Sequence, residues 1–120
     1  MKNYLSFPRS HRLVSKSEYK SLFDESNKVS QRYLLALYKR NEKSHARVGI
    51  IVGKRVANHA VVRNQIKRIV RESFRANQIQ FPGYDIVVIA RQQCDSLDKT
   101  QLREGIEKLW QKLAIQFQKV

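Results

Sequence analysis

Residues 54–75 have the sequence KRVANHAVVRNQIKRIVRESFR, and this stretch determines much of how the chain folds and what it binds. Plotted at about 100° per residue, the segment from Ala60 to Arg75 has two different sides. One side is apolar and collects Val62, Ile66, Ile69, Val70 and Ser73, with Phe74 at its margin. The other side is basic and polar and collects Arg63, Asn64, Lys67, Arg68, Arg71 and Arg75. We predict one amphipathic helix whose apolar side packs on a core.

The basic side of this helix is poorly balanced by acids, since Glu72 is the one acidic residue in the segment. Like charges four residues apart repel each other and weaken an isolated helix. In a solvated surface helix nothing offsets this repulsion, whereas in a helix that binds a polyanion the attraction to the bound anion offsets it. The pattern therefore favours a nucleic-acid-binding helix.

Length and composition narrow the class of protein. The chain has 120 residues, 42% of them hydrophobic, and a formal net charge of +14, which indicates one folded domain with an anionic partner. The longest apolar run, Ile86–Ala90, is too short to cross a membrane, and the first residues do not resemble a secretory signal. The single cysteine, Cys94, excludes an internal disulfide. We expect a cytoplasmic protein.

The rest of the chain supplies short elements around the basic helix. Residues 1–14 suit an extended basic arm, and Ser15 and Glu18 have capping-box spacing ahead of a helix over residues 16–25. Strands are expected over residues 32–40 and 47–53, paired as an antiparallel hairpin, and over residues 84–91. Asn58 is the expected cap of the basic helix. A last helix follows residues 96–98, with Trp110 and Phe117 in the core. This order predicts a single-domain α+β sandwich.

The basic helix carries a resemblance to a known family. Arg63-Asn64-Gln65-Ile66-Lys67-Arg68 resembles the Arg-Asn-Arg/Lys motif of the bacterial ribonuclease P protein component. The flanks at residues 48–55 and 70–75, and the strand at 84–91, are similar too, so the resemblance runs from about Phe7 to about Leu113. Gln65 departs from the motif, which usually has a second cation there.

The resemblance implies a fold and a role. The fold would have the order αβββαβα, a small, mostly antiparallel central sheet, an extra short strand near residues 28–31 and a left-handed βαβ crossover around the basic helix. The role would be to assist a catalytic RNA subunit, which uses Mg²⁺, in endonucleolytic removal of the 5′ leader from precursor tRNA. The protein would act as a monomer in that ribonucleoprotein, with no cofactor of its own and no membrane or DNA partner. The implied RNA-binding residues are Lys54, Arg55, Arg63, Asn64, Gln65, Lys67, Arg68, Arg71 and Arg75.

The family also has a cleft for the single-stranded leader, which the resemblance places at Tyr19, Phe23 and Ala36. Aromatic rings among cations suit single strands because bases stack on them. Tyr19 and Phe23 have helical core spacing as well, so we expect Tyr19 to be partly exposed and leave Phe23 open between cleft and core. No catalytic or metal site is expected in the chain itself, because His11, His45 and His59 are isolated from one another and from paired acids.

Other classes of protein share part of this pattern. A basic ribosomal or RNA-assembly protein without an associated enzyme has the same composition, and the motif with its flanks argues against it. A helix-turn-helix DNA binder would need a second helix a short turn before the basic one. A membrane-surface helix would carry large apolar residues opposite its basic side in contact with lipid. We keep the RNA-assembly protein as the alternative.

Overall fold

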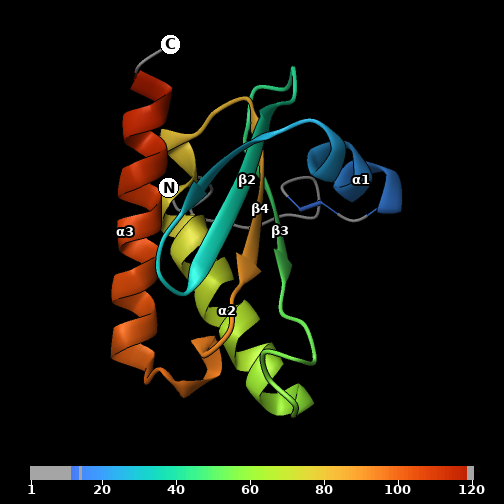
Figure 1. Ribbon diagram of the computed structural model, residues 1–120. Coiled ribbons are helices and arrows are strands. Elements are labelled where there is room, and N and C mark those ends of the chain that lie inside the picture. Colours follow the sequence, from blue (N-terminus) through green and yellow to red (C-terminus); the bar gives the residue numbers. More distant parts are fainter. Residues whose placement is uncertain (1–11, 14, 119–120) are drawn as a thin grey trace.

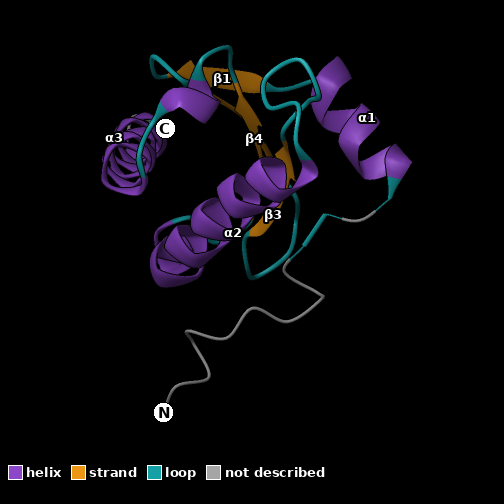
Figure 2. Ribbon diagram, turned by 90° about the horizontal axis from the view of Figure 1, so that it is seen from below, coloured by secondary structure: helices purple, strands orange, loops and turns teal. Residues whose placement is uncertain are grey.

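The computed structural model describes residues 12–13 and 15–118 as a layered α+β domain. A central sheet has the helices α2 (Ala60–Asn77) and α3 (Lys99–Gln118) on one face and α1 (Lys16–Asp24) on the other (Figures 1 and 2). The order of helices and strands is αβββαβα, as expected, with short 3₁₀ turns at Gln78–Gln80 and Cys94–Ser96. Most of the expected arm, residues 1–11 and 14, lies outside the described residues.

The sheet has four strands in the order β1-β2-β4-β3, which corrects one expectation. These are β1 (Asn27–Ser30), β2 (Leu34–Arg40), β3 (Arg47–Ile51) and β4 (Tyr84–Ala90). The predicted hairpin between β2 and β3 is wrong, because β4 lies between them, antiparallel to β2 and parallel to β3. The sheet is mostly antiparallel, as predicted, and β1 confirms the extra strand near residue 28.

The physical reason for the central place of β4 is its composition. From Ile86 to Ala90 it contains no polar side chain, and both of its faces are covered. Such a strand exposes the least apolar surface to water when it has a neighbouring strand on each edge and a helix layer on each face. β3 therefore reaches β4 through the crossover helix α2 rather than pairing with β2 directly.

Most of the core lies between the sheet and the pair α2 and α3. Ile66, Ile69 and Val70 of α2 are buried there, which confirms the predicted apolar side of that helix. An aromatic group closes this layer and contains Phe74, Phe81, Trp110 and Phe117, with ring centroids 5.4–5.9 Å apart in the contacting pairs. Trp110 donates a hydrogen bond of 2.8 Å to Ser73 Oγ. The core placement of Trp110 and Phe117 is thereby confirmed.

A smaller cluster on the opposite face holds α1. Leu22, exposed to only 1%, packs with Leu13 and Val87. The predicted capping box begins α1: Ser15 Oγ accepts from the amide of Glu18 at 3.2 Å, and Glu18 Oε1 accepts from the amide of Ser15 at 3.1 Å. This small cluster leaves the outer side of α1 in solvent.

The third helix begins in the same way as the first. Asp98 Oδ1 accepts from the amide of Gln101 at 2.7 Å, and Gln101 Oε1 accepts from the amide of Asp98 at 3.0 Å. The cap predicted within residues 96–98 is therefore Asp98. In the described part of the chain, no helix has the length and apolar character needed to cross a membrane.

Candidate nucleic-acid interface

The solvent side of α2 carries cations that are not paired with acids. Asn64, Gln65, Arg68 and Arg75 are exposed, and Arg63, Lys67 and Arg71 are half-buried. The ion pairs among the described residues use the cations of Lys20, Lys39 and Arg47, and none uses a cation of α2. We call this side of the helix the α2 cation surface; its members are Arg63, Asn64, Gln65, Lys67, Arg68, Arg71 and Arg75.

Two shallow hollows lie on the α2 cation surface. One is lined by Val61, Asn64, Gln65, Lys67, Arg68 and Arg71. The other is lined by Arg12, Arg68, Arg71, Glu72 and Arg75. Arg68 and Arg71 border both hollows and therefore stand at the centre of the positive surface. Guanidinium groups arranged around a hollow suit phosphate, which they bind through two parallel hydrogen bonds.

Arg63 differs from its neighbours because it also holds the backbone. Its Nη1 donates to the carbonyl oxygens of Ala57 at 2.9 Å and of Asn58 at 3.0 Å. The expected cap, Asn58, is not the N-cap: that position is His59, whose side chain makes no capping hydrogen bond. Arg63 thus ties the preceding loop to the first turn of α2.

Lys54 and Arg55 are exposed in that same loop, where the turn is closed by hydrogen bonds of 3.1 Å from the amides of Val56 and Ala57 to the carbonyl oxygen of Gly53. The loop therefore presents two more cations just before the helix that carries the rest.

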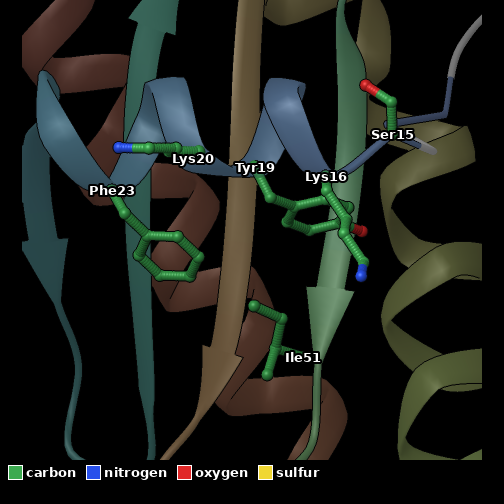
Figure 3. Close-up of a pocket in the computed structure, with 6 residues that line it drawn as sticks. All are labelled: Ser15, Lys16, Tyr19, Lys20, Phe23 and Ile51. Carbon is green, nitrogen blue, oxygen red and sulfur yellow. The ribbon is translucent and has the colours of Figure 1, made fainter.

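A second surface lies between α1 and the sheet. We call it the α1 cleft; it is lined by Ser15, Lys16, Tyr19, Lys20 and Phe23 of α1 with Ile51 of β3 (Figure 3). The rings of Phe23 and Tyr19 extend from the same side of the helix over the strands (Figure 3). Phe23 is 53% exposed, which answers the open question in favour of the cleft. Tyr19 is half-buried, as expected.

Tyr19 lies directly over Gly49 of β3. A Cβ at residue 49 would be 2.7 Å from the ring atoms Cε1 and Cζ of Tyr19, closer than such atoms pack. Burial raises the pKa of the Tyr19 hydroxyl, while a backbone hydrogen bond from Ile50 and the charge of Arg71 lower it, and burial prevails. Because Arg71 belongs to α2, the α1 cleft lies within the electrostatic field of the α2 cation surface.

The third residue expected in this cleft, Ala36, is elsewhere. Its side chain is fully buried in the cluster beneath α2 and α3. Side chains alternate between the faces of a strand, so Leu37, the next residue, packs on the α1 side with Tyr19. The placement of Ala36 in the cleft is therefore wrong, because Ala36 lies on the face of β2 opposite to α1.

The cleft residues that the sequence analysis missed are Ser15, Lys16, Lys20 and Ile51. Lys16 and Lys20 could have been found from their spacing, because they alternate with Tyr19 and Phe23 on adjacent turns of one helix. Ile51 required knowledge of which face of β3 α1 covers.

Among residues 12–13 and 15–118, no three His, Cys, Asp or Glu side chains are placed to hold a metal ion. His11 lies outside the described residues. Cys94 is buried, and burial together with the charge of Asp95 raises the pKa of its thiol to about 11. A thiol with that pKa is a poor nucleophile near neutral pH.

Comparison with known proteins gives one consistent result. A family model described as Ribonuclease P matches residues 7–114. The ribonuclease P protein component of Marinobacter nauticus is 46% identical over 110 residues, 91% of this chain and 83% of that protein. That of Stutzerimonas stutzeri is 40% identical over 109 residues, 90% of this chain and 83% of that protein.

Solved structures are similar as well. The RNase P protein of Staphylococcus aureus superposes with a TM-score of 0.81 at 29% identity, over 86% of this chain and 94% of that one. The RNase P protein of Thermotoga maritima gives a TM-score of 0.75 at 31% identity, over 84% and 96% of the two chains.

Proposed function

The chain belongs to the ribonuclease P protein family, and on that premise we propose that it is the RNA-binding subunit of a ribonuclease P ribonucleoprotein that removes the 5′ leader from precursor tRNA. In this proposal the α2 cation surface binds the RNA subunit, and the α1 cleft binds the single-stranded leader. The protein acts as a monomer in the cytoplasm, and neither a membrane nor DNA is its partner.

The observation that carries the proposal is the α2 cation surface without acidic partners. Each cation that neutralises a phosphate releases counterions from the RNA, which favours binding. Arg68 and Arg71, shared by the two hollows, are the expected centre of this contact. Lys54 and Arg55 extend it along the loop before α2.

The shape of the α1 cleft supports the second contact. An exposed ring at Phe23 offers a face on which a base can stack, and Lys16 and Lys20 line the cleft, where a phosphate backbone could pass. Paired bases keep their faces within a duplex, so a single strand is the form of RNA that such a cleft can bind.

Hydrolysis in this proposal belongs to the RNA subunit and its Mg²⁺ ions. The protein contributes substrate affinity, and its cations replace part of the screening that Mg²⁺ would otherwise supply. It should therefore matter most when Mg²⁺ is scarce.

Reconstitution tests the proposal. The protein alone should not cleave precursor tRNA at any Mg²⁺ concentration, whereas its addition to a bacterial ribonuclease P RNA should stimulate cleavage most strongly at low Mg²⁺. An RNA-assembly protein without enzymatic role would bind RNA but leave the cleavage rate unchanged. Cleavage at one defined site by nuclease-free protein without RNA would overturn the proposed division of labour.

A further inference from the structure

The carboxylate of Glu18 joins two parts of the molecule. Its Oε1 accepts the capping-box hydrogen bond from the amide of Ser15 at 3.1 Å. Its Oε2 accepts a hydrogen bond from Arg47 Nη1 of β3 at 2.6 Å, in an ion pair whose side chains are only 26% and 14% exposed. The first turn of α1 is therefore tied to the sheet by a partly shielded charge pair, which is stronger than one in open solvent.

Arg47 is itself fixed by the neighbouring strand. Its Nε donates to Asp85 Oδ1 at 2.8 Å and its Nη2 donates to Asp85 Oδ2 at 2.6 Å. Asn41 Nδ2 adds a further hydrogen bond to Asp85 Oδ1 at 2.8 Å. The pair with Asp85 raises the pKa of the Arg47 guanidinium, so it stays charged. Arg47 thus offers Glu18 a rigid partner rather than a mobile one.

The tie lies beside the aromatic part of the α1 cleft. Glu18 precedes Tyr19 in α1, and Arg47 is two residues from Gly49 in β3. Residues two apart in a strand share a face, so the contact of Glu18 with Arg47 and that of Tyr19 with Gly49 lie on the same face of β3. The Tyr19 ring comes closer to β3 at Gly49 than a Cβ at that residue would allow, and it is carried there by the first turn of α1.

We propose that Glu18 is a positioning residue of the α1 cleft: through Arg47 it holds the first turn of α1, and with it the Tyr19 ring, in the place where single-stranded RNA binds. This inference rests on the proposed leader contact at that cleft. Ligand binding to a site fixed in advance avoids the cost of ordering that site.

Other contacts keep α1 on the sheet without Glu18. Leu22 is buried beneath the helix, and Lys39 Nζ donates to Ser21 Oγ at 2.6 Å. Glu18→Gln retains an acceptor for the capping box and leaves the bidentate pair of Arg47 with Asp85 intact. The substitution should therefore loosen the first turn while α1 stays docked.

Glu25→Gln is the matched control. It makes the same chemical change in the C-cap residue of α1, where the carboxylate is 82% exposed and 3.8 Å from Lys39. Both variants raise the net charge by one, which by itself strengthens RNA binding. A weaker affinity of the Glu18→Gln enzyme would thus oppose the electrostatic trend that Glu25→Gln reports.

The experiment uses reconstituted enzyme with precursor tRNA that carries a leader and with the same tRNA lacking it. We expect Glu18→Gln to raise KM for the leader-bearing substrate roughly three- to tenfold with kcat unchanged. Binding of the tRNA without leader and binding of the RNA subunit should not change, which also shows that the variant folds. Glu25→Gln should leave KM level or lower it.

The outcomes separate the inference from the function on which it rests. If Phe23→Ala weakens leader binding and Glu18→Gln does not, the cleft binds the leader and the positioning role of Glu18 is wrong. An equal loss on both substrates would also refute it, because it would indicate a general structural defect. If Phe23→Ala has no effect, the leader contact fails and the inference fails with it.

Discussion

Gly49 controls how closely α1 can approach the sheet, and its substitution tests the geometry of the cleft. Gly49→Ala puts a methyl group 2.7 Å from Tyr19 ring atoms, so the half-buried ring must swing away. We expect leader affinity to fall. The free energy of unfolding should also fall, by about 1 kcal/mol, which is the low end for overpacking because the ring can move into solvent. Thermal unfolding and binding of precursor tRNA with and without leader measure the two effects.

Gly53→Ala provides the matched control for this substitution, because a Cβ at residue 53 meets no atom within 4 Å. It should leave both leader affinity and stability near the parent values. A Gly49→Ala protein with normal leader affinity would show that the position of the Tyr19 ring does not matter for RNA.

Arg63 and Arg68 are one motif in the sequence but differ in the structure, which predicts different phenotypes. Arg68→Ala removes an exposed cation, so it should weaken binding to the RNA subunit and flatten the slope of log affinity against log salt by roughly 0.7 to 0.9. Arg63→Ala should do this and also lower stability by about 1 kcal/mol, because it loses hydrogen bonds to the carbonyl oxygens of Ala57 and Asn58. Equal melting temperatures for the two variants would contradict the structural role of Arg63.

The residues of the α2 cation surface could be predicted because a helical period alone decides which side chains share a side. The cleft residues depended on more. Tyr19 and Phe23 came from one helix, but Ala36 required knowing which face of β2 is turned toward α1, and alternation along a strand names two faces without saying which helix covers each.

At the scale of whole elements, α2 begins without the cap that its neighbours have. Ser15 caps α1 and Asp98 caps α3, whereas His59 at the N-cap of α2 makes no side-chain hydrogen bond. His59 already has the extended backbone of an N-cap, with φ −93° and ψ 133°. We expect His59→Ser to raise the free energy of unfolding by about 1 kcal/mol.

Chemical denaturation measures this gain, and Asp98→Ala, which removes an existing cap, should cause a loss of similar size. A His59→Ser protein no more stable than its parent would mean that a serine hydroxyl at residue 59 does not accept from the free N–H groups in the first turn of α2.

The helices and the strands β2, β3 and β4 followed from local patterns, whereas β1 was implied only by the family resemblance and the pairing of the strands was not predicted correctly. Capping spacing and apolar periodicity located α1 and α2 to within two residues of their observed ends, and they placed the start of α3 just after residues 96–98. The hairpin expected between β2 and β3 failed because pairing is set by burial of the whole sheet: β4, apolar on both faces, takes the place between them. The local sequence of β2 and β3 does not show that β4 will pair with both of them in place of the hairpin.

At the scale of the molecule, the charge that serves RNA binding works against the isolated fold. A net charge of +14 on a body of 37 × 36 × 28 Å repels itself, which destabilises the compact state. The screening length is about 30 Å at 0.01 M salt and about 10 Å at 0.1 M, so at low salt the repulsion acts across the whole protein and at 0.1 M only between neighbours.

Salt should therefore have opposite effects on the fold and on RNA binding. We expect the melting temperature of the free protein to rise between 0.01 and 0.1 M NaCl, whereas affinity for the RNA subunit falls over the same range.

Arg68→Ala should raise the melting temperature of the free protein at low salt. It should lose that advantage at high salt, because the removed charge no longer matters once it is screened. A melting temperature that is independent of salt would show that the repulsion is already neutralised within the chain. Bound RNA supplies negative charge directly and binds only the folded protein. The melting temperature of the protein with RNA at 0.01 M NaCl should therefore exceed that of the free protein at every NaCl concentration from about 0.01 to 0.1 M.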